Sequence, residues 1–252
     1  MRRSLVLLGV ALLGSACNGT EESAGTGGGA GTTTTTTTTS TGGAGGAVCG
    51  PDVAPPDEVV GTTDPEGGVF TLDEALVELP DGPGPLRAVV ETTLGTLTCT
   101  FHEDVAPNAV ANFVGLARGR RAWREPGSAN WVRRPFYDGL IFHRVIPGFV
   151  AQGGDPLGTG YGGPGYQFAD EIGSLSHQDG TLAYANSGAN TNGSQFYICD
   201  GPQTSLDGGY TIFGECAPTT LVDTITGVPT DANDKPLTPV TITSVTVTRC
   251  AP

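Results

Sequence analysis

Basic residues are scarce in this sequence. Its 252 residues include 12 Lys and Arg against 26 Asp and Glu, which gives a formal net charge of −14. A chain with this excess of negative charge is repelled by a phosphate backbone, so nucleic-acid binding is not expected. No apolar run reaches the about 18–20 residues of a membrane-spanning helix. The 40 glycines follow no G-x-y repeat, which excludes a collagen-like chain.

Metal and cofactor motifs are also lacking. The six cysteines contain no C-x-x-C pair, and His102, His143 and His177 have no ligand spacing with them or with one another, so no metal site is expected. Residues 158–163 match G-x-G-x-x-G, but prolines on both sides exclude the strand and helix that a dinucleotide site requires. The sequence therefore predicts no cofactor.

The N-terminus has the features of an export signal. Arg2 and Arg3 precede an apolar stretch over residues 5–13, and small residues follow before Cys17. We predict that residues 1–16 are a signal peptide. The stretch before Cys17 also resembles a bacterial lipobox, in which this cysteine is acylated and anchors the protein to a membrane of the cell envelope. The alternative is ordinary cleavage, which would give a soluble secreted or periplasmic protein.

Two segments separate this signal from the domain. Residues 17–47 are rich in Gly and Thr and include an unbroken threonine run over 32–39, so they are expected to form a disordered tether. Residues 48–85 are predicted to be an irregular extension with one short helix. Thr71 and Glu74 form a capping-box pattern there, and the apolar residues that follow it have helical spacing and would dock on the domain.

Residues 86–252 have the pattern of a mainly β domain. Leu97, Cys99 and Phe101 alternate with threonines, which predicts a strand paired with residues 88–92. Further short strands are expected over 140–145, 149–152, 181–185, 196–199, 211–213 and 240–248. Pro107 would begin a helix that ends at Gly119. The last strand changes phase, which predicts a β-bulge near Ser244. Short strands with few helices favour a barrel or sandwich.

Two side-chain groups allow further predictions. Six arginines between residues 118 and 134 flank a tryptophan-containing loop and are expected to be a solvated insertion. If Cys17 is lipidated, five other cysteines remain, so at least one is a free thiol or pairs with another chain. Cys99, on the buried face of its strand, is the expected free thiol. Cys49 and Cys250, which flank the domain, are the most plausible disulfide pair.

Two motifs carry a resemblance to a known family. Residues 142–149 read Phe-His-Arg-Val-Ile-Pro-Gly-Phe, and residues 190–196 read Asn-Thr-Asn-Gly-Ser-Gln-Phe. At these motifs the chain closely resembles the cyclophilin family of peptidyl-prolyl cis/trans isomerases, over about residues 86–249. The resemblance implies an eight-stranded antiparallel β-barrel closed by two α-helices, the second near residues 218–226.

The resemblance also implies the site. Arg144 would stabilise the twisted prolyl amide, with Gln152 holding it in place and Phe149 beginning the proline pocket. The expected substrate-binding residues are Val150, Ala185, Asn186, Gln195, Tyr197, Leu206 and Tyr210. Of these, the backbone of residues 185, 186 and 195 would hold an extended peptide, Val150, Tyr197 and Leu206 would complete the pocket, and Tyr210 would contact the substrate.

Three positions depart from the family pattern. Tyr197 replaces the usual pocket Phe, and Tyr210 replaces a His that binds substrate in many members. Ser205 stands where cyclosporin-sensitive animal members carry Trp, so weak cyclosporin binding is expected.

The predicted protein is therefore a monomeric isomerase that acts on proline-containing polypeptides outside the cytoplasm. Two alternatives remain open on the sequence alone. A non-catalytic peptide-binding chaperone on the same scaffold would be expected to have lost Arg144 or Phe149, which are both present. A surface interaction protein would suit the Thr/Gly-rich stalk but would not need the pocket residues.

Overall fold

The computed structural model describes residues 50, 52–68 and 70–250. The predicted signal peptide, Cys17, the tether and Cys49 lie outside these residues. In the part of the chain that is described, no helix is both long enough and apolar enough to cross a membrane. Because residues 1–49 are not described, the predicted boundaries of the signal peptide, the tether and the domain stay predictions.

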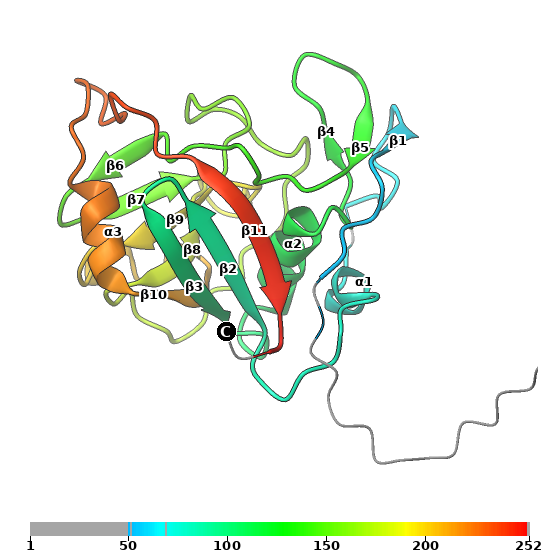
Figure 1. The fold of residues 1–252 in the computed structure, drawn as a ribbon, viewed down its shortest axis with the longest axis horizontal. Helices are drawn as coiled ribbons and strands as arrows, with labels where there is room; N and C mark the ends of the chain where they lie inside the picture. Colours follow the sequence, from blue (N-terminus) through cyan, green and yellow to red (C-terminus); the bar gives the residue numbers. More distant parts are fainter. Residues whose placement is uncertain (1–49, 51, 69, 251–252) are drawn as a thin grey trace, which may run out of the picture. The chain divides into compact units, whose positions relative to one another are not determined.

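Eight antiparallel strands form one curled sheet, in the order β11-β2-β3-β10-β8-β9-β7-β6 (Figure 1). The strands span Arg87–Thr92 (β2), Gly95–Phe101 (β3), Arg144–Ile146 (β6), Val150–Gly153 (β7), Thr181–Tyr184 (β8), Phe196–Cys199 (β9), Ile212–Ala217 (β10) and Ile242–Thr248 (β11). An isolated bridge between Ile141 and Thr241 links the segments that lead into β6 and β11, at the two ends of this order. The predicted mainly β, eight-stranded antiparallel architecture is thus confirmed.

The first hairpin follows from the alternation in the sequence. β2 and β3 pair in register, with Ala88 opposite Cys99 and Val90 opposite Leu97. All four of these side chains are buried, while the threonines between them on β3 are partly exposed. Because successive side chains of a strand point to opposite faces, the period of two places one face of the hairpin in the core.

The change of phase in the last strand produces the predicted bulge. The register of β11 against β2 shifts between Ile242 and Ser244. Ile242 lies before the shift and Val245 and Val247 lie after it, and all three are buried. The extra residue therefore lets the apolar side chains before and after the shift face the core.

The strand predicted over residues 140–145 is shorter in the structure. Only Arg144–Ile146 forms β6, and the residues before it bond to the segment that leads into β11. The Phe142 amide donates to the Val240 carbonyl at 3.0 Å, and the Ile242 amide donates to the Leu140 carbonyl at 2.8 Å. This apolar segment thus helps to join the ends of the sheet instead of extending one strand.

Two helices pack on the sheet. α2 (Pro107–Ala117) begins at the predicted proline, and Gly119 after it has a φ of +68°, which favours glycine. α3 (Thr219–Thr226) lies where the second helix was expected. Phe113 of α2 and Val222 and Ile225 of α3 all belong to the main hydrophobic core.

The extension covers the outer side of α2. α1 (Leu72–Leu76) has the predicted capping box, with both of its bonds present, and lies beside α2 (Figure 1). Phe70, just before α1, lies so close to Gly115 that a Cβ atom there would be 2.2 Å from its ring. Glycine is therefore needed at this point of α2. Docking of the short helix on the domain is confirmed.

The extension also adds a strand to a second, small sheet. This sheet has the order β1-β5-β4, formed by Glu58–Gly61 (β1), Trp131–Arg133 (β5) and Trp123–Arg124 (β4). β1 belongs to the extension, whereas β4 and β5 belong to the loop that the arginines flank. The two segments are thus joined by backbone hydrogen bonds.

The prediction that the arginines form a solvated insertion is wrong for two of them. Arg118 and Arg121 are 2% and 1% exposed, respectively. Arg118 donates to both carboxylate oxygens of Asp52 at 2.8–3.0 Å, and Arg121 donates to those of Asp64 at 2.7 and 2.8 Å and also contacts Glu66. These three acids all come from the extension. Burial is tolerated because each guanidinium is paired and hydrogen-bonded.

The prediction for Cys99 is also wrong. Cys99 forms a disulfide with Cys216, which lies directly opposite it where β3 pairs with β10. Among the described residues the free thiol is instead Cys199, which is buried on β9. Cys250 is disulfide-bonded, and its predicted partner Cys49 lies outside the described residues. The sheet register, which brings together residues 117 positions apart, decided the Cys99 pairing.

Candidate active site

A short hairpin positions the two central polar residues of the expected site. Arg144 at the start of β6 lies directly opposite Gln152 on β7, and Gly148 in the turn between them has a φ of +70°. The Arg144 Nη1 atom is 3.5 Å from the Gln152 Oε1 atom. The guanidinium carbon of Arg144 also lies 5.9 Å from the centre of the Phe149 ring. The three residues predicted to be catalytic are therefore neighbours.

Arg144 has another neighbour that no pattern in the sequence indicates. The Arg144 Nε atom lies 3.6 Å from the Asp234 Oδ2 atom, and both side chains are partly exposed. The Asp234 carbonyl accepts a bond from the Val145 amide at 2.8 Å, which ties its loop to β6. Asp234 is 90 positions from Arg144 in the chain and has a φ of +62°. Only the packing of this loop against β6 reveals the pair.

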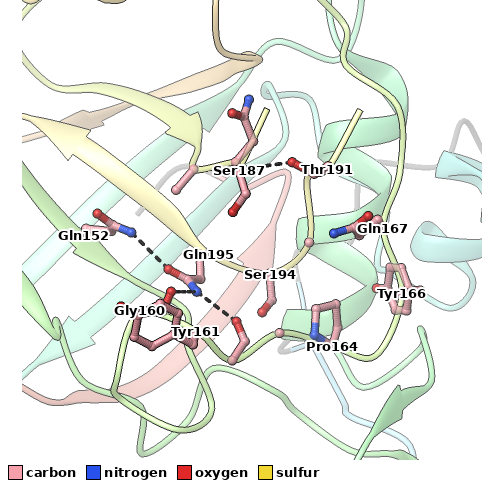
Figure 2. Close-up of a pocket in the computed structure, with 15 residues that line it drawn as sticks. Gln152, Gly160, Tyr161, Pro164, Tyr166, Gln167, Ser187, Thr191, Ser194 and Gln195 are labelled. Carbon is pink, nitrogen blue, oxygen red and sulfur yellow. Dashed lines mark hydrogen bonds between the residues drawn. The ribbon is translucent and has the colours of Figure 1, made fainter. Parts of the chain in front are cut away.

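A chain of amide side chains connects Gln152 to a neighbouring loop (Figure 2). Gln152 Nε2 donates to Gln195 Oε1 at 3.0 Å, and Gln195 Nε2 donates to the carbonyls of Gly160 and Gly162 at 2.9 and 2.8 Å. The same residues line a hollow of about 260 Å³ that also includes Ala185 and Asn186. Gln152 is thereby held between the guanidinium and this hollow.

The loop that carries Gly160 is itself fixed by a buried carboxylate. Asp155, 1% exposed, accepts the amides of Leu157, Thr159 and Gly160 at 2.6–2.8 Å. Burial opposes the ionisation of Asp155, but these backbone donors outweigh it and hold its pKa below the usual value. The loop beside the hollow is therefore preorganised in the free protein.

An apolar cluster lies on the face of the sheet opposite the main core. Along β9, Phe196 and Ile198 face the main core, while Tyr197 and Cys199 face this second cluster. Its buried members are Val150, Ala183, Tyr197, Cys199 and Ile212, and Phe149, Leu175, Ala185, Leu206 and Tyr210 pack against them. All four side chains predicted for the proline pocket, Phe149, Val150, Tyr197 and Leu206, are therefore brought together from three separate segments of the chain, and Tyr210 packs beside them.

The peptide-binding backbone expected at residues 185 and 186 lies beside the hollow. The Ala185 amide donates to the Gln195 carbonyl at 2.9 Å, so this donor is already used within the protein. The Asn186 side chain donates to the Gly209 carbonyl at 3.2 Å and accepts from the Gly188 amide at 3.2 Å. These bonds fix the segment in which a substrate backbone would be held.

No pattern in the sequence assigned a role to His177, and its spacing only argued against a metal ligand. It is fully buried behind the pocket and bonds to both Tyr197 and Asp207. Its only signal in the sequence was that an isolated histidine precedes a strand. A histidine buried in a hydrogen-bonded chain has no spacing rule, so this role could not be found without the structure.

The curated relatives reported next are named for one activity. The family model of cyclophilin-type peptidyl-prolyl cis-trans isomerases matches residues 87–247. The probable peptidyl-prolyl cis-trans isomerase A of Mycobacterium leprae is 46% identical over 165 residues, which cover 64% of this chain and 91% of that protein. Peptidyl-prolyl cis-trans isomerase B of Streptomyces anulatus is 46% identical over 172 residues, which cover 64% of this chain and 96% of that protein.

Solved structures agree with the sequence relatives. A cyclophilin-type peptidyl-prolyl cis-trans isomerase of Cryptosporidium parvum, solved in the presence of the dipeptide Ala-Pro, matches with a TM-score of 0.56 and 32% identity. The match covers 64% of this chain and 98% of that one. The family model covers more than half of the chain and includes the Arg144 hairpin, the amide chain and the apolar cluster. The chain therefore belongs to the cyclophilin-type peptidyl-prolyl cis-trans isomerase family and has the activity for which that family is named.

Proposed function

We propose that Arg144 is the catalytic residue and acts by electrostatic stabilisation of the twisted prolyl amide. The peptide bond before proline has partial double-bond character, so its rotation barrier is about 18–20 kcal/mol. In the twisted state conjugation is lost and the prolyl nitrogen regains a lone pair. A guanidinium directed at this nitrogen stabilises the transition state more than the planar ground states, which is what lowers a barrier.

The observation that carries this proposal is the place of Arg144 at the edge of the apolar cluster. Its guanidinium lies over the Phe149 ring at 5.9 Å, while Gln152 contacts it from the opposite strand. A proline ring packed against Phe149, Tyr197 and Leu206 would bring its nitrogen close to the charge. The Ala-Pro dipeptide present with the Cryptosporidium relative supports proline-containing polypeptides as the substrates.

Gln152 and Gln195 are proposed to orient the substrate and not to change its bonds. Their amide chain fixes the Gln152 side chain, which leaves its oxygen toward Arg144. The backbone around Asn186 would hold the extended peptide that precedes the proline. Isomerisation makes and breaks no covalent bond, so a charge, a pocket and a fixed backbone provide every element of this mechanism.

The test is turnover of a short X-Pro peptide by the wild type and by Arg144→Ala. We expect the variant to lose about 10²-fold or more in kcat/KM, because electrostatic transition-state contributions are typically of order 3 kcal/mol. Arg124→Ala is the matched control, since Arg124 is an exposed arginine on β4. Circular dichroism must show that both variants are folded. Full activity of Arg144→Ala would overturn the mechanism, and a wild type that binds the peptide without turnover would favour the non-catalytic alternative.

We further propose that the protein assists folding outside the cytoplasm and is anchored by lipid on Cys17. The signal-like residues 1–16 and the Gly/Thr-rich stretch after Cys17 support this proposal. The Cys99–Cys216 disulfide independently supports the location outside the cytoplasm, because disulfides persist mainly in oxidising compartments.

The anchor is tested by fractionating cells that express the full chain. Wild type is expected in the membrane fraction with the added mass of acyl chains, and Cys17→Ser is expected in the soluble fraction. Cys199→Ser is the control, since this buried thiol lies in the folded domain. A soluble wild type without acyl mass would show simple secretion instead.

A further inference from the structure

A fully buried histidine lies directly behind the apolar cluster. His177 is 0% exposed, and both of its ring nitrogens have partners. Nδ1 is 2.7 Å from the Asp207 Oδ1 atom, and Nε2 is 2.9 Å from the Tyr197 hydroxyl. The chain Asp207–His177–Tyr197 therefore runs from a partly exposed carboxylate to the wall of the proposed proline pocket.

The chemistry of the end groups gives this chain a direction. Asp207 accepts bonds from the Ser176 hydroxyl at 2.6 Å and from the His177 amide at 2.8 Å. These bonds, with that of the His177 ring, lower the pKa of Asp207 to about 2, so it is an ionised acceptor and Nδ1 carries a proton. Burial raises the pKa of Tyr197, so the phenol keeps its proton, and in the tautomer with the proton on Nδ1 its O–H donates a hydrogen bond to Nε2.

His177 also connects the other walls of the cluster. Its backbone carbonyl accepts from the Gln203 amide at 2.9 Å, and its amide and ring bind Asp207. The 3₁₀ turn Thr204–Leu206 lies between these two anchors, and its last residue packs in the cluster. The ring of Tyr210 lies edge-on to His177, with centres 6.4 Å apart. His177 thus contacts three segments that form the pocket: its ring contacts Tyr197, Asp207 and Tyr210, and its backbone carbonyl and amide hold the two ends of the turn.

We infer that His177 is a positioning residue for the isomerase reaction, which holds Tyr197 and the Thr204–Leu206 turn in the geometry that receives the proline ring. This inference rests on the proposed pocket. Tyr197 stands where the family usually has Phe, so its hydroxyl needs a partner in a buried place, and His177 supplies it. The proline ring occupies the pocket in the ground state and in the transition state alike, so its wall contributes to KM more than to kcat.

The first experiment replaces His177 by phenylalanine, which keeps a ring and removes both nitrogens. We expect KM for a short X-Pro peptide to rise about tenfold, since a buried hydroxyl loses its partner, while kcat stays within about twofold. Kinetics are measured at a temperature where melting curves show every variant to be folded. His102→Phe, in the turn that leads into α2, is the matched control and should change neither constant. A lower melting temperature with unchanged KM would mean a merely structural role and would overturn the inference.

The second experiment removes the unpaired hydroxyl as well. The double variant His177→Phe/Tyr197→Phe leaves no polar atom of the pair, so KM should return to within about threefold of wild type. Failure of this rescue, or a fall of kcat alone in the single variant, would contradict the positioning role. If His177→Phe does not fold, Asp207→Ala provides the same measurement from the partly exposed end of the chain, with a smaller rise of KM expected.

The third measurement does not depend on activity. Nitrogen-15 NMR of the histidines in the wild type should show His177 protonated at Nδ1, with an unprotonated, hydrogen-bonded Nε2, in the neutral state. A proton on Nε2 instead would overturn the assigned direction of the chain. Because wild type and Arg144→Ala are assayed in parallel, failure of the proposed mechanism is seen separately from failure of the His177 inference.

Discussion

Arginines in two regions of this protein have opposite environments. Under the extension, the side chains of Arg118 and Arg121 are each 1% exposed, and they pair with carboxylates at 2.8 and 2.7 Å. At the pocket, the Arg144 side chain is 39% exposed. Its polar contacts, to Gln152 and Asp234, are 3.5 and 3.6 Å long.

The difference lies in what remains available to a ligand. A buried guanidinium that is fully paired has its charge compensated inside the fold, and its removal leaves carboxylates without a partner. A half-exposed guanidinium with long contacts keeps much of its potential directed at whatever enters the site. Exposure and contact length thus separate arginines that hold the fold together from the one that we propose to be catalytic.

The largest expected effect is on stability, from Arg121→Ala. Asp64 and Glu66 would lose a buried partner, and we expect the free energy of unfolding to fall by about 3–5 kcal/mol. Denaturant unfolding measures this change. Arg120→Ala is the matched control, because the Arg120–Glu78 pair involves an acid that is 75% exposed and should contribute under about 1 kcal/mol. Equal losses in the two variants would show that burial does not distinguish these arginines.

The next effect concerns the region around the pocket and the binding of an inhibitor, cyclosporin. Ser205 is exposed on the Thr204–Leu206 turn beside the pocket, where cyclosporin-sensitive animal members carry Trp. Burying about 100 Å² of indole against the macrocycle would contribute about 2.5 kcal/mol, near a hundredfold in affinity. We expect weak inhibition of the wild type and much tighter inhibition of Ser205→Trp, with peptide isomerisation changed only modestly. Nanomolar inhibition of the wild type would contradict this expectation.

A smaller effect is expected on the stability of the protein at low pH, through Asp64 of the extension. Burial opposes the ionisation of Asp64, but the hydrogen bond and charge of Arg121 outweigh it and lower its pKa to about 2. The folded state thus holds this proton less tightly than the unfolded chain, whose Asp pKa is about 3.9. Its contribution to stability is complete above that value and is lost as the pH falls toward 2. The melting temperature should therefore fall less between pH 5 and pH 2 in Asp64→Asn than in the wild type.

The smallest effect is a difference in thiol reactivity beneath the pocket. Burial, with the charges of Asp179 and Asp207, raises the pKa of Cys199 to about 12. Alkylation of the native protein at pH 8 should therefore leave Cys199 unmodified, whereas the unfolded protein should react fully. Mass spectrometry of the peptide that contains Cys199 measures both. Rapid modification of the native protein would show that the pocket opens more widely than its packing indicates.

Local patterns explain which elements were predictable. The capping box of Thr71 and Glu74, the β2–β3 hairpin and the bulge before Ser244 each depend on residues close together in the chain. The alternation of apolar residues in a strand and their spacing in a helix indicate directly which side chains share a face. The two long motifs located Arg144, Phe149 and Gln195 for the same reason, since each motif is a continuous stretch of the chain, and Gln152 follows the first motif within the same hairpin.

Long-range partners decided the rest, and the sequence by itself could not choose among them. From the sequence alone Arg121 is expected to be a surface charge, but in the fold the extension places Asp64 and Glu66 beside it. Cys99 reads as a lone buried thiol until the register of β3 and β10 places Cys216 opposite it. His177 acquires its partners only when β9 and the Thr204–Leu206 turn pack around it. The sequence determined the elements and the motif residues because these follow from local spacing. The tertiary structure decided which charges, thiols and ring nitrogens are paired, because pairing depends on which distant segments are packed together.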